Sequence, residues 1–461
     1  MGSVSKSLVT TGFFLFRPIH VIAVVTAISG SVPTLTPKLS VEELLPQICG
    51  DMWYDSTAIM RRYIWEDSGW PDLTVSEGAL EPELTTIAYR AGRVAEVLFQ
   101  LGRDEQRRVR FDTLADTALE TSAIEGEILS IASVRASLAR RLDMPLANYG
   151  STDARAEGVV GVTVDAVQRA NRELTEARLH HWHTLIFPDP DPQVTVGAWR
   201  SRPDDSIQVI SHAERRRPTI HFEAPPGPSV YGQMKRFLDW FSSPGRAPMQ
   251  RPLIHAAVAH LWFVTIHPYS DGNGRIGRAI ADLALARHDP EIAEYVSLSR
   301  QIRAERKSYY DALELAQRGS LDVTPWVAWF ARCYGRAIDH TLAVGREMIR
   351  ARSFWTDYAN AVINDRQRVV LQRYLSGAFE GWINTSKYAT LAKTSSDTAQ
   401  RDIAALVAQK ILVPNASRGP RTSYRLTDTY DPQIRRGVDP PQDVPRSAAG
   451  HDSMVPSSRK R

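Results

Sequence analysis

Thirteen consecutive residues, Ile266–Arg278, contain a histidine, an aspartate, three glycines and two arginines. They lie between an apolar run, Ala256–Val264, and a run typical of a helix, Ala279–Arg287. A glycine-rich turn that opens a helix leaves backbone N–H groups free, and these groups and the helix dipole favour an anion, typically a phosphate. Arg275 and Arg278 lie three residues apart on one face, where a cation opposes the dipole unless an anion or a carboxylate lies opposite.

His267 and Asp271 supply groups that can act on a bound phosphate. A histidine can serve as a general base near neutral pH. An aspartate can hold a divalent ion such as Mg²⁺. The histidine, the aspartate, the glycine-rich turn and the two arginines together predict phosphoryl or nucleotidyl transfer.

The segment Gly272–Gly277 also fits G-x-G-x-x-G, the dinucleotide-binding fingerprint. That interpretation requires a preceding strand, for which Leu261–Ile266 would serve, and a surrounding βαβ unit. However, Leu253–Val264 is equally typical of one buried helix, and no alternation of strands and helices follows. A second alternative is a surface turn whose charges have no function. It would leave unexplained why both arginines lie at the helix end that disfavours cations. We therefore favour a phosphate-binding turn in a helical protein.

Composition limits the remaining classes of site. The chain has 461 residues, which favours two to four domains. Its two cysteines, Cys49 and Cys333, exclude a disulfide framework and a cysteine-based zinc site, and they fit a reducing cytoplasm. His180, His181 and His183 lack a carboxylate or cysteine partner at metal-binding spacing, so we expect His183 in the core and the other two on the surface.

The first 59 residues differ from the rest. Phe13–Ile28 is apolar, but Arg17 and Pro18 interrupt it and leave too short a run to span a bilayer. Met60–Trp65 looks like a natural chain start. We therefore expect 1–59 to be an over-extended gene start, with a disordered N-terminal arm as the alternative and export as the least favoured one. No membrane partner is predicted.

Hydrophobic periodicity predicts a mainly helical chain. We expect helices over Glu81–Leu101, Asp112–Ser122, Ile128–Leu142, two stretches within 158–187, Val230–Phe241, Leu253–Val264, and onward to about residue 349. The strand-like pieces Ile207–Ile210 and Thr219–Phe222 flank a charged link, Glu214–Arg217, and predict a hairpin.

The C-terminal part has a different character. Val362–Leu375 is expected to be helical, and Thr385–Ala392 with Ser396–Gln409 is typical of a helix-turn-helix. Ile411–Pro414 and Thr422–Leu426 would form a two-stranded wing, so 360–430 is predicted to be a winged helix-turn-helix. Residues 351–461 contain 17 Lys and Arg against 10 Asp and Glu. That basic excess raises the question of a nucleic-acid partner, although winged helices serve equally as protein-contact modules. The segment 431–461 is expected to be disordered.

The string HPYSDGNGRIGR resembles the signature of the Fic (Fido) family, HPFx(D/E)GNGRxxR, with Tyr269 where Phe is usual. Trp70–Leu73 resembles the opening of a small domain often found before Fic domains. The resemblance covers most of residues 60–335, and its other segments are Leu179–Phe187, Gly197–Arg200, Ser297–Tyr310 and Leu321–Phe330. It implies a Fic-type helical core with a β-hairpin flap. The expected domains are an N-terminal helical domain (60–150), a catalytic domain (151–350) and the winged helix (360–430).

The activity implied by the resemblance is that of a protein adenylyltransferase. His267 would take the proton from a Ser, Thr or Tyr hydroxyl of a protein target, which attacks the α-phosphate of the co-substrate ATP. Asp271 would hold Mg²⁺ between the α- and β-phosphates. The phosphate-binding residues would be Gly272, Asn273, Gly274, Arg275 and Arg278.

Two further segments acquire roles through the resemblance. Thr121–Gly126 resembles the inhibitory motif (S/T)xxxE(G/N), with Thr121, Glu125 and Gly126 at its defining positions. Glu125 would form a bidentate pair with Arg278, in the place of the γ-phosphate. The flap residues would bind the target as an added strand, and they are Ile207, Gln208, Val209, Ile210 and Ser211. Tyr309 and Tyr310 would pack either near the adenine or in the core.

Several alternatives stay open at the level of sequence. The same site could modify the chain itself or remove AMP, and it could use another nucleotide or a phosphocholine donor. A different class of function is a DNA-binding transcriptional regulator whose Fic core senses nucleotide. The expected location is the cytoplasm, and a homodimer is among the partners that the resemblance allows.

Overall fold

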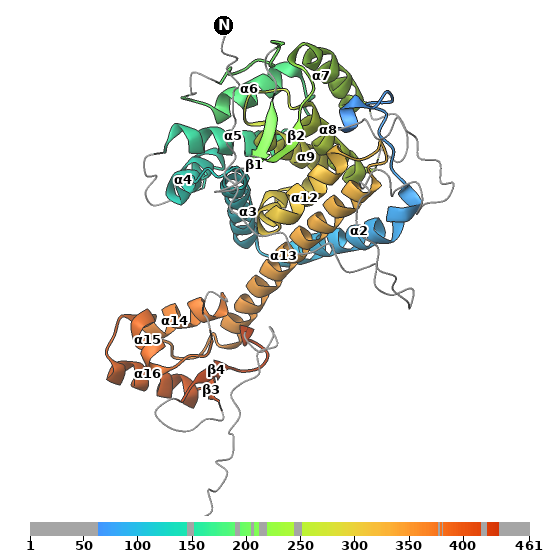
Figure 1. Cartoon of the computed structure of the whole chain (residues 1–461). Helices are drawn as coiled ribbons and strands as arrows, with labels where there is room; N and C mark the ends of the chain where they lie inside the picture. The colour runs from blue at the N-terminus through green and yellow to red at the C-terminus, as the bar shows by residue number, and fades with distance from the viewer. Residues whose placement is uncertain are drawn as a thin grey trace, which may run out of the picture. The chain divides into compact units, whose positions relative to one another are not determined.

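The computed structural model describes residues 63–144, 152–189, 194–203, 207–211, 219–243, 251–376, 379, 381–415 and 422–432. Residues 1–59 and 433–461, which two of the predictions above concern, lie outside the described residues. The chain divides into two compact units, Met1–Phe99 with Gln106–Leu342, and Gln100–Glu105 with Ala343–Arg461. The predicted mainly helical fold is confirmed (Figure 1).

The first unit is a helical body with one hairpin. Its elements are η1 (Ile64–Glu66), α2 (Glu77–Gln100), α3 (Arg103–Ile124), α4 (Ile131–Arg141), α5 (Ala154–Gln168), α6 (Glu176–Ile186), β1 (Gln208–Ser211), β2 (Thr219–Glu223), α7 (Gly227–Ser242), α8 (Pro252–Ile266), α9 (Asn273–His288), α10 (Pro290–Ala293), α11 (Leu298–Ala304), α12 (Arg306–Gln317) and the first part of α13 (Thr324–Asp357).

The centre of this unit is the pair α8 and α9. Helix α8 is apolar around its whole circumference and is buried from Leu253 to Ile266, as expected of a helix without a solvent face. It packs against α7 and α9, and α9 in turn packs against α5, α6 and α11. Since Leu261–Ile266 is helical rather than a strand, the dinucleotide-binding alternative is excluded.

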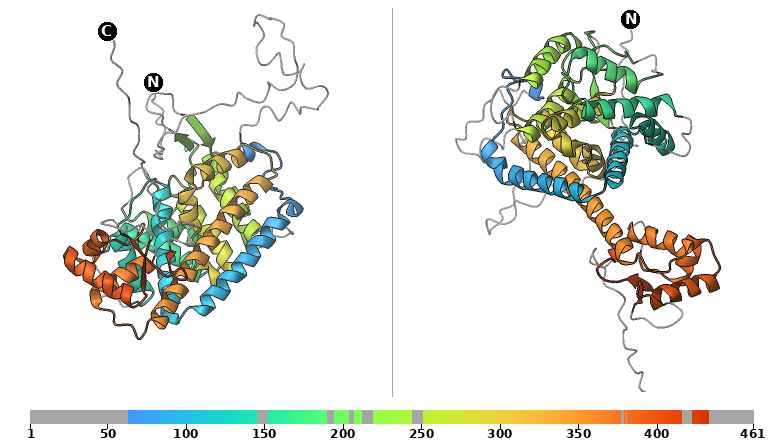
Figure 2. Two further views of the ribbon diagram at one scale, coloured as in Figure 1. Left: turned by 90° about the horizontal axis from the view of Figure 1, so that it is seen from below. Right: turned by 180° about the vertical axis from the view of Figure 1, so that it is seen from behind.

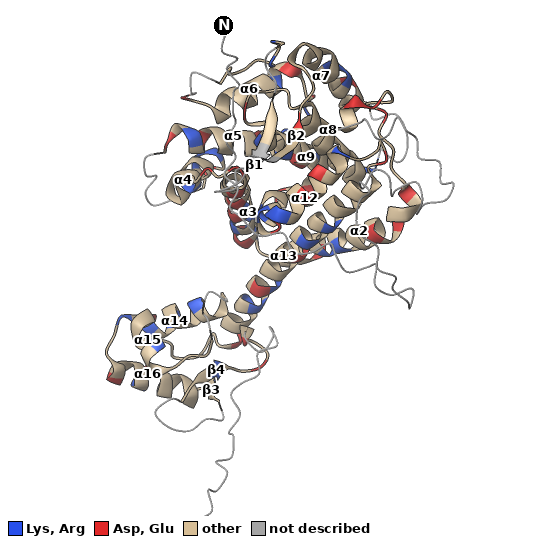
Figure 3. Cartoon of the chain, viewed as in Figure 1, with Lys and Arg blue, Asp and Glu red and all other residues tan. Residues whose placement is uncertain are grey.

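Peripheral helices are tied to the body by charged side chains. Helix α2 is joined to α13 by Arg90 with Asp339 at 2.8 Å and by Arg332 with Glu83 at 3.5 Å. Figure 3 shows charged residues along both helices. Among the described residues, no helix is both long and apolar enough to cross a lipid bilayer.

The predicted hairpin is present. Strands β1 and β2 pair antiparallel, with a shift in register between Val209 and Ile210. Figure 2 shows the hairpin at the edge of the helical body. Phe222 is buried against Tyr63, with ring centroids 5.2 Å apart, and Trp65 donates a hydrogen bond to the Glu223 carbonyl at 2.7 Å. The link Glu214–Arg217 lies outside the described residues.

The second unit contains, after the end of α13, helices α14 (Asp365–Leu375), α15 (Thr385–Ala392) and α16 (Ser396–Ala408), followed by strands β3 (Leu412–Pro414) and β4 (Tyr424–Leu426). The two strands pair antiparallel, and Ile383 adds a bridge to Tyr424. Asn384 and Ser395 cap the N-termini of α15 and α16 with their side chains. The order of elements is the one the sequence predicted.

Several predicted boundaries were wrong. Helix α3 begins at Arg103, whereas the predicted start was Asp112. The prediction missed the first two turns because they are charged and show little apolar periodicity. Helix α13 continues to Asp357 rather than to about 349. The start of α9 at Asn273 agrees with the sequence, which placed Arg275 and Arg278 at the opening of a helix.

Candidate active site

His267 ends helix α8 in a strained conformation. Its backbone is left-handed, with φ 52° and ψ 59°, and its N–H donates to the Phe263 carbonyl at 3.0 Å. A residue other than glycine adopts this conformation only where its surroundings impose it, and such residues cluster at functional sites. The turn directs the chain from buried α8 into the loop that opens α9.

Arg200 holds this turn in place. Its guanidinium donates through Nε to the His267 carbonyl at 2.7 Å and through a terminal nitrogen to the Ile266 carbonyl at 3.0 Å. Its backbone N–H donates to the Pro268 carbonyl at 2.9 Å, and the residue is only 4% exposed. A cation at a helix C-terminus satisfies the free carbonyls and complements the dipole. Arg200 therefore positions the backbone on both sides of the His267 side chain.

The His267 imidazole has a defined tautomer. Its Nδ1 lies 3.1 Å from the Val264 carbonyl, and a carbonyl can only accept, so Nδ1 carries the hydrogen. The lone pair is then on Nε2. Burial, with a contribution from the Arg200 charge, lowers the pKa of His267 to about 4. The ring is consequently neutral at physiological pH and can accept a proton.

Tyr269 anchors the loop from within. Its buried ring stacks on His183 with centroids 4.0 Å apart, and its hydroxyl lies 3.1 Å from Nδ1 of His180. This contact gives a partner to the hydroxyl that distinguishes Tyr269 from the usual phenylalanine. His183 is in the core as expected, where it bonds the Asp271 carbonyl and the Gly197 N–H. His180, which was expected on the surface, is partly buried at 21% exposure, because its ring also packs on Trp199 with centroids 4.2 Å apart.

The side chain of Asn273 stabilises the conformation of the loop. Its side-chain oxygen accepts from the Tyr269 N–H at 2.9 Å, and its side-chain amide donates to the Tyr269 carbonyl at 2.8 Å. If Asn273 binds a phosphate, as expected from the sequence, its backbone N–H would be the donor. Asp271 accepts from the Gly272 N–H through Oδ1 at 2.6 Å, and Oδ2 makes no hydrogen bond among the described residues.

Gly272 is required at the start of α9. It lies in the left-handed region at φ 79°, and a Cβ there would be 2.8 Å from the Phe187 ring. We expect Gly272→Ala to lower the free energy of unfolding by about 1–3 kcal/mol, because both the backbone and the space are unfavourable. Denaturant unfolding checks this, with Gly232→Ala, at an open helical position, as the control. Equal stability of the two variants would contradict the strained turn.

A carboxylate occupies the anion-binding end of α9. A Cβ on Gly274 would lie 2.1 Å from Oε1 of Glu125, so the glycine leaves the space that this carboxylate fills. Arg278 donates to Glu125 Oε1 at 2.8 Å. The contact expected between Glu125 and Arg278 is thus present. It is not bidentate, however, because Nε and the second terminal nitrogen of Arg278 donate to the hydroxyl and carbonyl oxygens of Thr121, at 2.9 and 2.8 Å.

Glu125 remains ionised in this position. Burial favours its neutral form, but the charge and hydrogen bond of Arg278 outweigh burial and hold the pKa of Glu125 below its usual value. Arg278 is only 1% exposed, so without a nearby anion it would be a buried unpaired charge. The pair thereby resolves the unfavourable placement of an arginine at a helix N-terminus.

Gly126 ends the helix that carries Glu125. It lies at φ 87°, its N–H donates to the Ala123 carbonyl, and the next N–H, of Glu127, donates to the Ser122 carbonyl. These two bonds are those of a Schellman motif, in which glycine is the usual left-handed residue. Arg306 donates to the Ile124 carbonyl at 2.9 Å and holds the same helix end.

Glu127, which was not predicted from the sequence to be a site residue, forms a second ion pair with the loop. Its Oε2 accepts from Arg275 at 2.6 Å, and the Arg275 guanidinium lies 4.8 Å above the Phe187 ring. The only sequence signal for it was a second acidic residue directly after the Glu125-Gly126 pair. Both arginines of the loop therefore face carboxylates from the end of α3.

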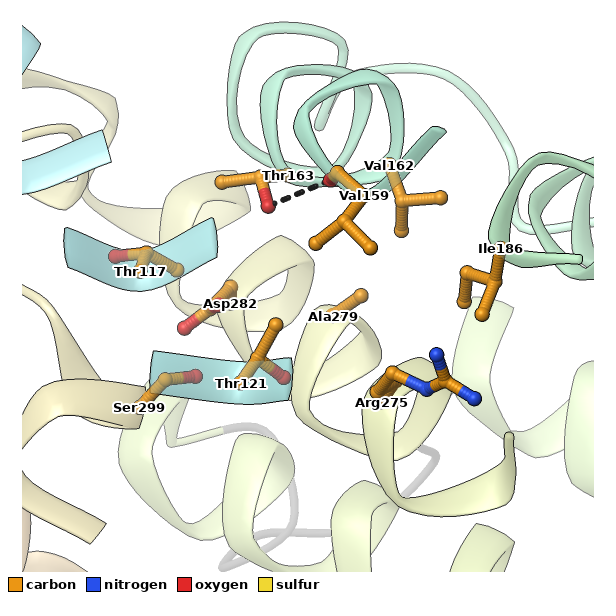
Figure 4. A pocket seen from close by; sticks show the side chains of 10 residues that line it. All are labelled: Thr117, Thr121, Val159, Val162, Thr163, Ile186, Arg275, Ala279, Asp282 and Ser299. Atoms are coloured by element: carbon orange, nitrogen blue, oxygen red, sulfur yellow. Dashed lines mark hydrogen bonds between the residues drawn. The ribbon is translucent and has the colours of Figure 1, made fainter. Parts of the chain in front are cut away.

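A small cavity borders the site, and Figure 4 shows its lining. Thr121, Arg275, Asp282 and Ser299 contribute polar atoms to it, and its volume of about 10 Å³ suits about one water molecule. Burial raises the pKa of Asp282 to about 7. The seam between α3 and α9 is thus partly polar rather than a continuous apolar contact.

The remaining expected residues lie away from the loop or in the core. No hydrogen bond of the described residues joins the flap residues 207–211 to residues 267–278. Tyr309 is buried, and its hydroxyl lies 2.9 Å from Nε2 of His260, so it packs in the core rather than in an open nucleotide site. No described group of three or more His, Cys, Asp or Glu has the arrangement of a metal site.

Two family models match the chain. Residues 173–285 match the Fic/DOC family, and residues 63–144 match a domain of unknown function, DUF4172. The protein adenylyltransferase Fic of Aedes aegypti is 35% identical over 29% of this chain and 26% of its own length. That of Nematostella vectensis is 29% identical over 48% of this chain and 47% of its own length.

A solved structure of a Fic family protein from Desulfovibrio desulfuricans G20 matches 74% of this chain and 96% of its own, with 20% identity and a TM-score of 0.42. The chain spans between about a quarter and a half of the two curated relatives described above. The Fic/DOC match includes the whole loop from His267 to Arg278. Residues 173–285, with the whole loop, are therefore similar to the Fic/DOC family.

Proposed function

We propose that this chain is a protein adenylyltransferase, which moves AMP from ATP to a hydroxyl side chain of a protein. The observation that carries the proposal is the ionised Glu125 carboxylate in the space above Gly274, bound by Arg278. A site that holds a carboxylate at a helix N-terminus beside an arginine is built to take anionic oxygens. The neutral His267 stands at the other end of the same loop. The adenylyltransferase names of the matching relatives support the choice of AMP transfer.

In the proposed reaction, the target hydroxyl oxygen attacks the α-phosphorus of ATP. A new P–O bond forms, the bond from the α-phosphorus to the oxygen that bridges to the β-phosphate breaks, and pyrophosphate leaves. Nε2 of His267 accepts the hydroxyl proton. The Nδ1–H contact with the Val264 carbonyl fixes the ring so that Nε2 is the basic atom.

The opening of α9 would hold the phosphates. The backbone N–H groups of Asn273 and Gly274 belong to the first turn, where they lack intrahelical partners. The Gly272 N–H donates to Oδ1 of Asp271 and would exchange this contact for a phosphate oxygen. Arg275 and Arg278 would neutralise charge on the outer phosphates and on departing pyrophosphate. Asp271 fits a Mg²⁺ ligand, because Mg²⁺ is often held by one carboxylate together with substrate phosphates. Bound Mg²⁺ would offset negative charge on the phosphates.

The flap supplies the proposed contact with a protein target. Residues Gln208–Ser211 form β1, the first strand of a two-stranded sheet, and a target segment would add to it through main-chain hydrogen bonds. Arg318 donates to the Ile220 and His221 carbonyls and attaches the hairpin to α12. Binding through the main chain tolerates many side chains, so the flap orients a hydroxyl rather than selecting one target.

Glu125 would act as an internal inhibitor in this scheme. Its carboxylate takes the donor on Arg278 and the space over Gly274 that a phosphate would need. Thr121 and Gly126 support it, since Thr121 fixes the orientation of Arg278 and Gly126 ends α3 at the required point. AMP transfer would then require the end of α3 to withdraw.

The nature of the transferred group is tested by intact-mass measurement. Glu125→Gly protein is incubated with ATP and Mg²⁺, alone and with a cell extract, and modified proteins are weighed and fragmented. Addition of AMP to a Ser, Thr or Tyr side chain is the expected outcome. Addition of phosphate alone, or of phosphocholine when that donor is supplied, would contradict the proposal.

The pH dependence of transfer reports on His267. Because only the neutral ring accepts a proton, activity should be lost as pH falls through its pKa and level above it. With that pKa lowered to about 4, kcat/KM of the Glu125→Gly variant should already be level at pH 6.5. Circular dichroism at each pH checks that the fold persists. A midpoint near the ordinary histidine value of 6.5 would contradict the buried, neutral ring.

Each domain of the chain has a role in the proposed function. Residues 60–150 would carry the inhibitory helix, 151–350 the catalytic domain, and 360–430 a winged helix that contacts a protein or DNA. The order of α14 to β4 supports a winged helix. Among the arginines near the two strands that could meet a DNA backbone, Arg418 and Arg421 lie outside the described residues, and Arg425 pairs with Asp428. The chain would work in the cytoplasm, where ATP is available, as a monomer or a homodimer.

A further inference from the structure

Glu127 binds the first arginine of the loop as Glu125 binds the second. The Glu127 carboxylate accepts from Arg275 at 2.6 Å, and the two side chains are 23% and 8% exposed. The corresponding values for Glu125 and Arg278 are 2.8 Å, 24% and 1%. In both pairs a nearly buried arginine meets a partly exposed carboxylate. The two contacts are thus alike in distance and burial.

Both carboxylates belong to one short, fixed turn. The Schellman bonds from Gly126 to Ala123 and from Glu127 to Ser122 tie the residues on either side of Gly126 to the last turn of α3. A movement that withdraws Glu125 from Gly274 would therefore carry Glu127 with it. The end of α3 behaves as a unit with two anionic contacts.

The charges on the two helix ends explain why they meet. Carboxylates at the C-terminus of α3 and arginines at the N-terminus of α9 each oppose the dipole of their own helix. Facing each other, the four charges form two ion pairs and remove both conflicts. An incoming triphosphate could satisfy the arginines equally well, since it also presents anionic oxygens at the N-terminus of α9.

One hydrogen-bond donor of the Arg275 side chain is unpaired among the described residues. Its Nε is buried and has no hydrogen-bond partner among the described residues. A buried unpaired donor has a free-energy cost that a ligand oxygen would relieve. Arg275 in this state is held by Glu127 without being fully satisfied, as expected of a ligand-binding group kept from its ligand.

We propose that Glu127 is a second inhibitory carboxylate, which withholds Arg275 from the nucleotide phosphates while Glu125 withholds Arg278. The proposal rests on the proposed function for its link to AMP transfer. It implies that removal of Glu125 alone relieves only part of the inhibition, because Arg275 stays paired. Full activity requires both carboxylates to leave or to be neutralised.

The test compares four proteins: wild type, Glu127→Gln, Glu125→Gly and the double variant. Glutamine keeps the size of the side chain and removes its charge. A matched control is Glu120→Gln, on the same helix, whose carboxylate faces Arg303 at 3.8 Å rather than the loop. Equilibrium binding of ATP with Mg²⁺, the rate of AMP transfer and thermal unfolding are measured on each full-length protein.

We expect Glu127→Gln to raise ATP affinity by about fivefold to tenfold, which is less than the full value of a charged hydrogen bond because the glutamine oxygen can still accept from Arg275. The double variant should transfer AMP about fivefold faster than Glu125→Gly at limiting ATP. The Glu120→Gln control should match wild type in both measurements. Thermal unfolding shows whether each variant is folded, and Glu127→Ala provides a second substitution if Glu127→Gln unfolds.

Two results would overturn the inference. Unchanged ATP affinity in Glu127→Gln and Glu127→Ala would show that Glu127 does not withhold Arg275. A slower transfer in the double variant than in Glu125→Gly would make Glu127 a positioning residue for Arg275 instead. Absence of AMP transfer in all four proteins would reject the proposed function, while the ATP affinities would still decide whether Glu127 competes with nucleotide.

Discussion

Replacement of Glu125 by glycine is expected to raise the rate of AMP transfer by about tenfold to a hundredfold. The carboxylate fills the space above Gly274 and takes one donor of Arg278. Its removal frees both for phosphate, and one charged hydrogen bond corresponds to about 1.5–3 kcal/mol, or about one to two powers of ten. The initial rate of pyrophosphate release measures the change.

Glycine also removes a side chain from the end of α3, so stability must be followed in parallel. Glu125→Gln serves as the control because it keeps the size of the side chain and removes only its charge. It should activate in the same direction and to a smaller extent. Wild-type rates in both variants, with the proteins folded, would show that Glu125 does not limit the reaction.

Replacement of His267 by alanine in the Glu125→Gly background is expected to slow AMP transfer by about a hundredfold to ten-thousandfold, the usual contribution of a general base. ATP affinity should change little, because no phosphate contact is assigned to the ring. Single-turnover transfer and equilibrium ATP binding separate the two effects. The measurement thus distinguishes a lost base from a collapsed site.

His181 provides a matched control for this substitution. It lies exposed on α6, whereas His267 ends α8 beside Arg200. His181→Ala in the same background should transfer AMP at the rate of Glu125→Gly. If His267→Ala retained most of the activity, the proton would have to leave through another group, and the assignment of His267 would fail.

The loop and the core were accessible from sequence because their signals are local. Residues 266–278 are contiguous, so their chemistry could be inferred before any fold was known. Apolar periodicity likewise indicated α8, and the strand-like pieces predicted the hairpin. The approach of Glu125 to Arg278, 153 residues apart, was inferred from the resemblance of Thr121–Gly126 to an inhibitory motif.

Other features depend on contacts that a single sequence does not reveal. Arg200 reaches the His267 carbonyl across 67 positions, and Glu127 reaches Arg275 across 148. Neither has a local periodicity that would indicate its partner. The contact of Glu125 is single rather than bidentate because Thr121 accepts from two other nitrogens of Arg278. The packing of α3 against α9 determines this arrangement.

In the proposed mechanism the His267–Arg278 loop transfers AMP and is held inactive by Glu125. The most direct test incubates wild type, Glu125→Gly, and Glu125→Gly with His267→Ala with ATP labelled either at the α- or at the γ-phosphate. We predict protein-bound α-label that is strong on Glu125→Gly, weak on wild type and absent from the double variant, with no γ-label on any. Label from the γ-phosphate, or no label on Glu125→Gly and its potential targets despite ATP binding, would contradict the account.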